Sequence, residues 1–151
     1  MDRHYLTSLL TPESIVVFAG RSDDAASQTP HARALHAALR AQRYAGTLHF
    51  LDIHTSGTLA DLAQSRADLA IIALPPGDVA AALELAGRMA CRSALVVSSG
   101  IGPQKAAELK RIAQREGINL LGPNCLGFQR PQLNLNASAI GPLARAGPLA
   151  L

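Results

Sequence analysis

The sequence predicts an α/β domain with a doubly wound, mainly parallel five-stranded sheet that carries helices on both faces. Short apolar segments alternate with longer amphipathic segments along the chain. The short segments are apolar at successive positions, as in strands that are covered on both faces. Because parallel strands need helical crossovers, and these crossovers are right-handed, the alternation is typical of a doubly wound sheet.

Five segments have the composition of buried strands. The first is preceded by Pro12 and followed by Gly20, the third stops before Pro75, and the fifth ends at Gly122. Gly and Pro at these places are the usual end signals of strands. The predicted strands span residues 15–19, 47–52, 69–74, 94–97 and 118–121.

The amphipathic segments between the strands predict the crossover helices. Thr29 can cap the first helix, with Pro30 at its first position, and its expected end is near Gly46. Pro103 opens the last helix and Gly117 ends it. The predicted helices span residues 30–46, 59–64, 78–89 and 103–116.

Length, composition and charge narrow the functional class. A chain of 151 residues with 48% hydrophobic residues suits one folded domain. The net charge of +3 comes from scattered Arg residues, and aromatic residues make up only 3%, which argues against nucleic-acid binding. No apolar run approaches the roughly 20 residues that span a bilayer. Cys91 and Cys125 have no metal-ligand spacing, so we expect a cytoplasmic protein with reduced thiols and without a metal site.

In an open parallel sheet, ligands bind beyond the carboxyl ends of the strands. The loop after the first strand begins with Gly20, Arg21 and Ser22 and lacks the G-x-G-x-x-G pattern of dinucleotide sites, so a solvated surface loop is the simpler interpretation. Asp52 ends the second strand, where an acid binds ribose hydroxyls in NAD-binding proteins. An Asp at this place also starts turns well, and both interpretations stay open.

Two later loops carry further candidate groups. Residues 98–103 place Ser and Gly between a strand and a helix, where they can hold a phosphate or serve as ordinary turn residues. Residues 122–127 contain two glycines, a proline and Asn124, whose side chain can bond to backbone. Cys125 lies in the same turn, but every histidine precedes residue 55 and only His54 follows a strand end. A nucleophilic Cys needs a nearby base, so the expected role of Cys125 is packing.

Four motifs follow one another along the chain: Leu-Thr-Pro-Glu-Ser-Ile at 10–15, Asp-Leu-Ala-Ile-Ile-Ala-Leu-Pro at 68–75, Ser-Ser-Gly-Ile at 98–101 and Leu-Gly-Pro-Asn-Cys-Leu-Gly at 121–127. The last is followed by Leu-Asn-Leu-Asn-Ala at 133–137. With these motifs the chain resembles the Rossmann-like CoA-binding domain of ADP-forming acyl-CoA synthetases and of the related succinyl-CoA synthetase α chain. The resemblance covers nearly the whole chain, and residues 121–127 are its most specific part.

The resemblance implies CoA as the ligand, bound at the carboxyl ends of the strands. It implies no catalytic residue in this chain, whose parent is expected to be an ADP-forming acyl-CoA synthetase or a synthetase–acetyltransferase fusion. Residues 1–130 are expected to form the CoA-binding domain, and residues 131–151 an extended segment leading to a following domain. The implied cofactor-binding residues are Gly20, Arg21, Ser22, Asp52, His54, Pro75, Ser98, Ser99, Gly100, Asn124 and Cys125.

Two alternative functions stay open. An NAD(P)-binding oxidoreductase domain is favoured by Asp52 and opposed by the missing glycine pattern. A scaffold domain without ligand is favoured by the acidic Asp23 and Asp24, and by Leu-Asp-Ile-His at 51–54, where the family has a Val-Asn-Pro-like turn. The expected partners are CoA or acyl-CoA and further domains of the same chain, without nucleic acid or membrane, and a homo-oligomer is compatible with the sequence.

Overall fold

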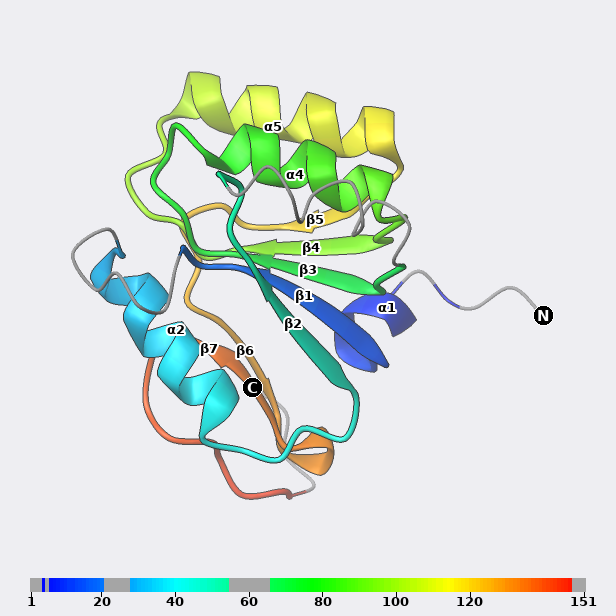
Figure 1. The fold of residues 1–151 in the computed structure, drawn as a ribbon, viewed down its shortest axis with the longest axis vertical. Coiled ribbons are helices and arrows are strands. Elements are labelled where there is room, and N and C mark those ends of the chain that lie inside the picture. The colour runs from blue at the N-terminus through cyan, green and yellow to red at the C-terminus, as the bar shows by residue number, and fades with distance from the viewer. Residues whose placement is uncertain (1–3, 5, 21–27, 55–65, 148–151) are drawn as a thin grey trace.

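The computed structural model describes residues 4, 6–20, 28–54 and 66–147. Its main sheet has five strands, all parallel, in the order β2-β1-β3-β4-β5 (Figure 1). From β1 the chain winds first to β2 on one side, and then to β3, β4 and β5 on the other. The predicted parallel five-stranded sheet is confirmed. Its strands span Ser14–Phe18 (β1), Thr47–Leu51 (β2), Leu69–Ile72 (β3), Ser93–Val96 (β4) and Asn119–Leu121 (β5).

Helices cover both faces of this sheet, as predicted. The helices α4 (Val79–Arg88) and α5 (Pro103–Glu116) pack on one face, and α2 (Pro30–Arg40) lies on the opposite side (Figure 1). A short helix, α1 (Thr7–Leu10), joins the α2 side through Leu9. Successive strand residues enter different cores: Val17 packs with α2, whereas Val16 packs with α4 and α5. The central strands are therefore apolar on both faces.

The sequence predicted the start of α2 correctly and its end incorrectly. The Thr29 hydroxyl accepts a hydrogen bond from the Ala32 N–H at 3.1 Å, and Pro30 opens the helix, as predicted. The helix ends at Arg40, so the predicted end near Gly46 is wrong. Residues 41–46 lead to β2 instead, and the Tyr44 hydroxyl among them donates a hydrogen bond to the Pro12 carbonyl. The predicted helix 59–64 lies outside the described residues.

An antiparallel hairpin lies on the α2 side of the sheet and was not predicted. It consists of β6 (Gly127–Arg130), a 3-10 turn (Pro131–Leu133) and β7 (Leu135–Ser138). Leu135 and Ala137 are buried in the core beneath α2. Within residues 131–151, expected as an extended segment leading to a following domain, β7 thus packs into the core of this domain. The boundary between a domain of residues 1–130 and a following segment stays a prediction.

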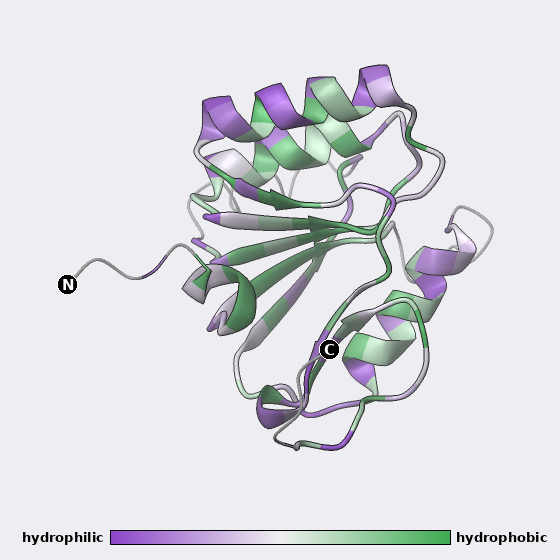
Figure 2. Cartoon of the chain, turned by 180° about the vertical axis from the view of Figure 1, so that it is seen from behind, coloured by the Kyte–Doolittle hydropathy of each residue, from purple (hydrophilic) through white to green (hydrophobic). Residues whose placement is uncertain are grey.

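The distribution of hydropathy agrees with this layered arrangement. Figure 2 shows apolar strands at the centre and hydrophilic residues on the outer faces of the helices. Within the described ranges, none of the helices combines the length and the apolar character that crossing a membrane requires.

Candidate functional site

The carboxyl ends of the parallel strands lie together on one edge of the sheet, at the left of Figure 1. The winding direction reverses between β1 and β3, and ligands of such sheets bind at the crevice that this reversal opens. Gly20 follows β1 with a φ of +73°, a conformation that glycine adopts without strain. Arg21 and Ser22, which follow it, lie outside the described residues.

Two adjacent serines after β4 have different environments. Ser98 is 3% exposed, and its hydroxyl accepts the Leu74 N–H at 3.0 Å, so it joins the ends of β3 and β4. Ser99 is exposed, and its hydroxyl lies 3.4 Å from His31 Nδ1 in the first turn of α2. The Ser99 hydroxyl is therefore accessible to a ligand, whereas the Ser98 hydroxyl is occupied inside the fold.

Ser99 and Gly100 form the exposed tip of this loop, which is called the tip below. The φ of Gly100 is +74°, and a Cβ added there would meet no atom within 4 Å. The requirement for glycine is therefore conformational, and the backbone of the tip is open to solvent. Ser99, Gly100 and the start of α2 together present hydroxyl, imidazole and backbone groups of the kind that hold anions at helix N-termini.

The turn at residues 122–127 packs against the end of β4. The Asn124 side chain bonds to both backbone groups of Ile101, and the Asn124 N–H donates to the Ser98 carbonyl at 3.1 Å. A Cβ at Gly122 would collide with the Val96 carbonyl, which explains the glycine there. The turn thus supports the loop that carries Ser99 and Gly100.

Cys125 occupies the packed position expected from the sequence. Its side chain is half-buried against the core beneath α2, and its thiol donates to the Val96 carbonyl at 3.3 Å. Cys91 is buried at the opposite end of β4, and burial raises the pKa of its thiol to about 12. Among the described residues, no His, Cys, Asp and Glu side chains gather in a group that could hold a metal ion.

The end of β2 forms a second group of candidate residues. Asp52 Oδ1 accepts the His54 N–H at 2.9 Å, and His54 Nε2 lies 3.6 Å from Asp78 Oδ2 at the start of α4. Both side chains of that pair are solvent-accessible, so its contribution to stability is small. Pro75 is exposed after β3. These groups include two carboxylates, those of Asp52 and Asp78.

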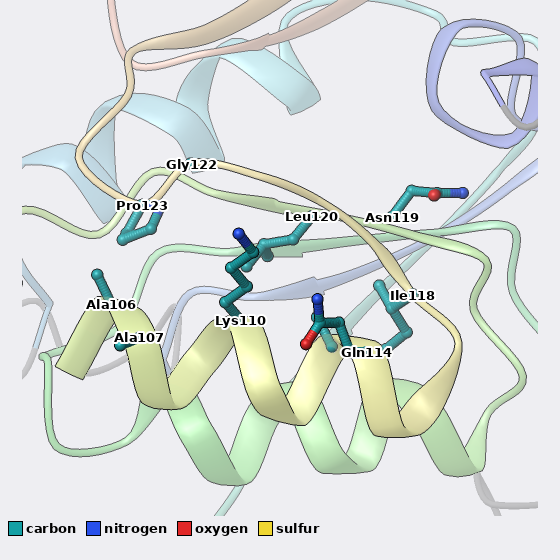
Figure 3. A pocket seen from close by; sticks show the side chains of 10 residues that line it. Ala106, Ala107, Lys110, Gln114, Ile118, Asn119, Leu120, Gly122 and Pro123 are labelled. Carbon is teal, nitrogen blue, oxygen red and sulfur yellow. The ribbon is translucent and has the colours of Figure 1, made fainter. Parts of the chain in front are cut away.

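A groove that sequence analysis missed lies along the edge strand β5 (Figure 3). It encloses about 460 Å³ and is lined by α5 residues, including Lys110 and Gln114, and by residues 118–120 of the β5 segment. Gly122 and Pro123 close one end, so the groove adjoins the turn that supports the Ser99 loop. A second groove of about 540 Å³ lies at the opposite edge of the sheet, beside Tyr44 and Leu133. Neither groove includes a residue predicted to bind cofactor.

Comparisons with known proteins identify relatives of this chain. Residues 47–131, more than half of the chain, match the model of the CoA binding domain family. The chain is 39% identical over 77 residues to acetate–CoA ligase [ADP-forming] I of Archaeoglobus fulgidus, a match that covers 47% of this chain and 11% of the relative. It is 33% identical over 89 residues to the α subunit of acetate–CoA ligase [ADP-forming] II of Pyrococcus furiosus, covering 55% and 19%. The chain thus spans less than a fifth of the length of these curated relatives.

Solved structures share the fold. A Pyrococcus horikoshii protein superposes with a TM-score of 0.76 at 22% identity, covering 93% of this chain and 34% of the other. The dinucleotide-forming acetyl-coenzyme A synthetase 1 of Ca. Korarchaeum cryptofilum, solved with phosphate and ADP, gives a TM-score of 0.74 at 23% identity and covers 89% and 30%. The family match carries the assignment, and the structures agree with it in fold: the chain belongs to the CoA-binding domain family.

Proposed function

We propose that this domain binds CoA at the carboxyl edge of its sheet. The observation that carries the proposal is the exposed tip of Ser99 and Gly100, which faces the first turn of α2 beside the reversal of strand order. Membership of the CoA-binding domain family supports CoA as the ligand that uses this edge.

The residues at this edge fit the chemistry of CoA, which combines phosphates, amides and an adenosine. Gly20 and Gly100 place no side chain between their backbone and a phosphate, and the positive end of α2 favours the same charge. His31 and the Ser99 hydroxyl add side-chain donors. We place the phosphates on this side of the edge and include Arg21 and Ser22 from the sequence alone.

The β2 end suits a different part of the ligand. The carboxylates of Asp52 and Asp78 repel a phosphate and accept hydrogen bonds from hydroxyl or amino groups. We therefore assign Asp52, His54 and Pro75 to the adenosine end. We assign Ser98, Asn124 and Cys125 a supporting role, because their side chains already bond to backbone groups of the fold.

The parent protein that we propose is an ADP-forming acyl-CoA synthetase that acts in the cytoplasm. The relatives named as ADP-forming acetate–CoA ligases support this proposal. In such a protein this domain presents CoA, and further domains supply the chemistry of acyl activation. A synthetase–acetyltransferase fusion is a second parent that would use the same domain.

Isothermal titration of the 151-residue chain with CoA, and separately with NAD, tests the proposed ligand. We expect CoA to bind more tightly than NAD. Tighter binding of NAD would favour a dinucleotide-binding domain with Asp52 on the ribose. Absence of heat and of thermal stabilisation with either ligand at millimolar concentration would favour a scaffold role.

A further inference from the structure

We propose that Asn124 is a positioning residue that holds the tip of Ser99 and Gly100 in the conformation that receives the ligand. This inference rests on the proposed function, because it assigns a role in CoA binding. It concerns a residue whose own amide is already engaged within the fold, so its effect on the ligand passes through the loop after β4.

Asn124 binds both ends of the exposed tip. On one side, its backbone N–H donates to the Ser98 carbonyl at 3.1 Å. On the other side, its Oδ1 accepts the Ile101 N–H at 3.1 Å, and its Nδ2 donates to the Ile101 carbonyl at 2.9 Å. Ser99 and Gly100 are the residues between these two attachments. A single side chain and its own backbone therefore set the separation of the two ends of the tip.

The two attached residues are themselves fixed. Ser98 is 3% exposed and is bonded through its hydroxyl to Leu74, and Ile101 is 6% exposed within the core formed with α4 and α5. Asn124 adopts a left-handed conformation with a φ of +58°, which Asn tolerates better than most residues. The turn, the buried ends and the tip thus form one connected unit.

The physical consequence is preorganisation of the tip. A loop that is already ordered loses less conformational entropy when a ligand binds than a loop that must first be ordered. Removing the Asn124 amide leaves the fold of the sheet and the buried Ile101 side chain in place, and loosens the Ile101 backbone at the end of the tip. Affinity for CoA then falls, although the groups that we assign to the phosphates, Ser99, Gly100 and His31, are unchanged.

Asn124→Gly isolates the amide, because glycine keeps the backbone N–H and accepts the left-handed φ. Asn134→Gly is the matched control, since Asn134 has a φ of +53° but lies in the β6–β7 loop without a bond to the tip. We expect the Kd of CoA, measured by titration calorimetry, to rise about fivefold for Asn124→Gly, on the scale of roughly one residue's ordering entropy. For Asn134→Gly we expect the Kd to stay within about twofold, as for a substitution remote from the site.

Two further measurements separate positioning from direct contact or general destabilisation. Hydrogen exchange of the Ile101 amide should become faster in Asn124→Gly without ligand, because its acceptor is gone. In a double-mutant cycle with Ser99→Ala, the losses of CoA affinity should be non-additive, whereas two independent ligand contacts would add. If Asn124→Gly does not fold, Asn124→Asp replaces it, because this variant keeps the acceptor for the Ile101 N–H and loses the donor to the Ile101 carbonyl. Its Kd for CoA should rise relative to the wild type, and an unchanged Kd would overturn the positioning role.

The outcomes distinguish this inference from the proposed function. Wild-type protein that does not bind CoA overturns the proposed function itself, and the positioning role falls with it. Wild-type protein that binds CoA, together with an Asn124→Gly variant whose Kd stays within twofold or whose affinity loss adds to that of Ser99→Ala, overturns the positioning role alone.

Discussion

Replacing each of the two serines after β4 by alanine should affect different properties of the protein. Ser98→Ala removes the acceptor of the Leu74 N–H, and both residues are buried, at 3% and 6% exposure. Water cannot replace that acceptor without entering the junction of β3 and β4. Ser99→Ala removes an exposed hydroxyl whose described contact is His31 at 3.4 Å, and water replaces it readily.

The expected magnitudes follow from these environments. A buried donor left without a partner costs about 1–3 kcal/mol, so Ser98→Ala should lower the free energy of unfolding by about 2 kcal/mol. For a domain of this size that corresponds to a decrease in Tm of roughly 4–8 °C. Ser99→Ala should change the free energy of unfolding by less than about 0.5 kcal/mol, as is usual for a surface substitution.

Urea unfolding followed by circular dichroism measures these changes in stability, and calorimetric titration measures the affinity of each variant for CoA. Ser99→Ala should weaken CoA binding by about fivefold, the scale of one net hydrogen bond. The reasoning is refuted if Ser98→Ala is as stable as the wild type, or if Ser99→Ala destabilises the fold as much as Ser98→Ala does. Equal CoA affinity of the wild type and Ser99→Ala would remove Ser99 from the site.

Three further substitutions test other parts of the structure. Cys125→Ser should leave the Kd of CoA within about fivefold, because a hydroxyl can make the bond of the packed thiol; loss of turnover in a full-length parent that still binds CoA would contradict this. Gly122→Ala should lower the free energy of unfolding by more than about 2 kcal/mol, since its φ is +95° and a Cβ would strike the β4 backbone; a stable variant in urea would disprove that clash. Burial, together with the Arg40 charge, lowers the pKa of His36, so the unfolded state takes up a proton first and stability falls as pH drops through about 6.5. Between pH 7.5 and pH 5.5, roughly one unit on either side of the ordinary histidine pKa of the unfolded state, His36→Gln should therefore lose less stability than the wild type. Equal losses would show that the pKa of His36 is not lowered in the folded protein.

Most of the fold was predictable because its signals are local. The Pro30 and Pro103 helix starts, the Thr29 cap and the apolar strands each depend on a few neighbouring residues, and all were found where expected. The β6–β7 hairpin carries no comparable signal. Leu135 and Ala137 provide only a brief alternation, and their burial depends on α2, which is distant in the sequence.

The sequence predicted which loops form the candidate site, but not which side chains in those loops are exposed or which groups they bond to. Parallel strands bring their carboxyl ends to one edge, so the loops could be named from strand order alone. Ser98 and Ser99 are identical residues side by side in the sequence, and only the three-dimensional packing shows which hydroxyl is exposed to solvent. The partner of the Asn124 amide was equally hidden, because Ile101 belongs to a different loop and offers only its backbone.

This division of roles explains why a turn whose Asn124 and Cys125 side chains already bond to the fold is the most specific sequence motif of the chain. Gly122 must be glycine to pass the β4 backbone, Asn124 must reach both backbone groups of Ile101, and Cys125 must fit against the core. Each requirement is imposed by the backbone and core of the protein itself, whatever ligand is bound. Exposed Ser99 is free of such requirements. Ligand preference should therefore change most readily through substitutions at the tip and at the start of α2, whereas loss of the Asn124 amide from the turn should weaken binding of every ligand that uses the tip.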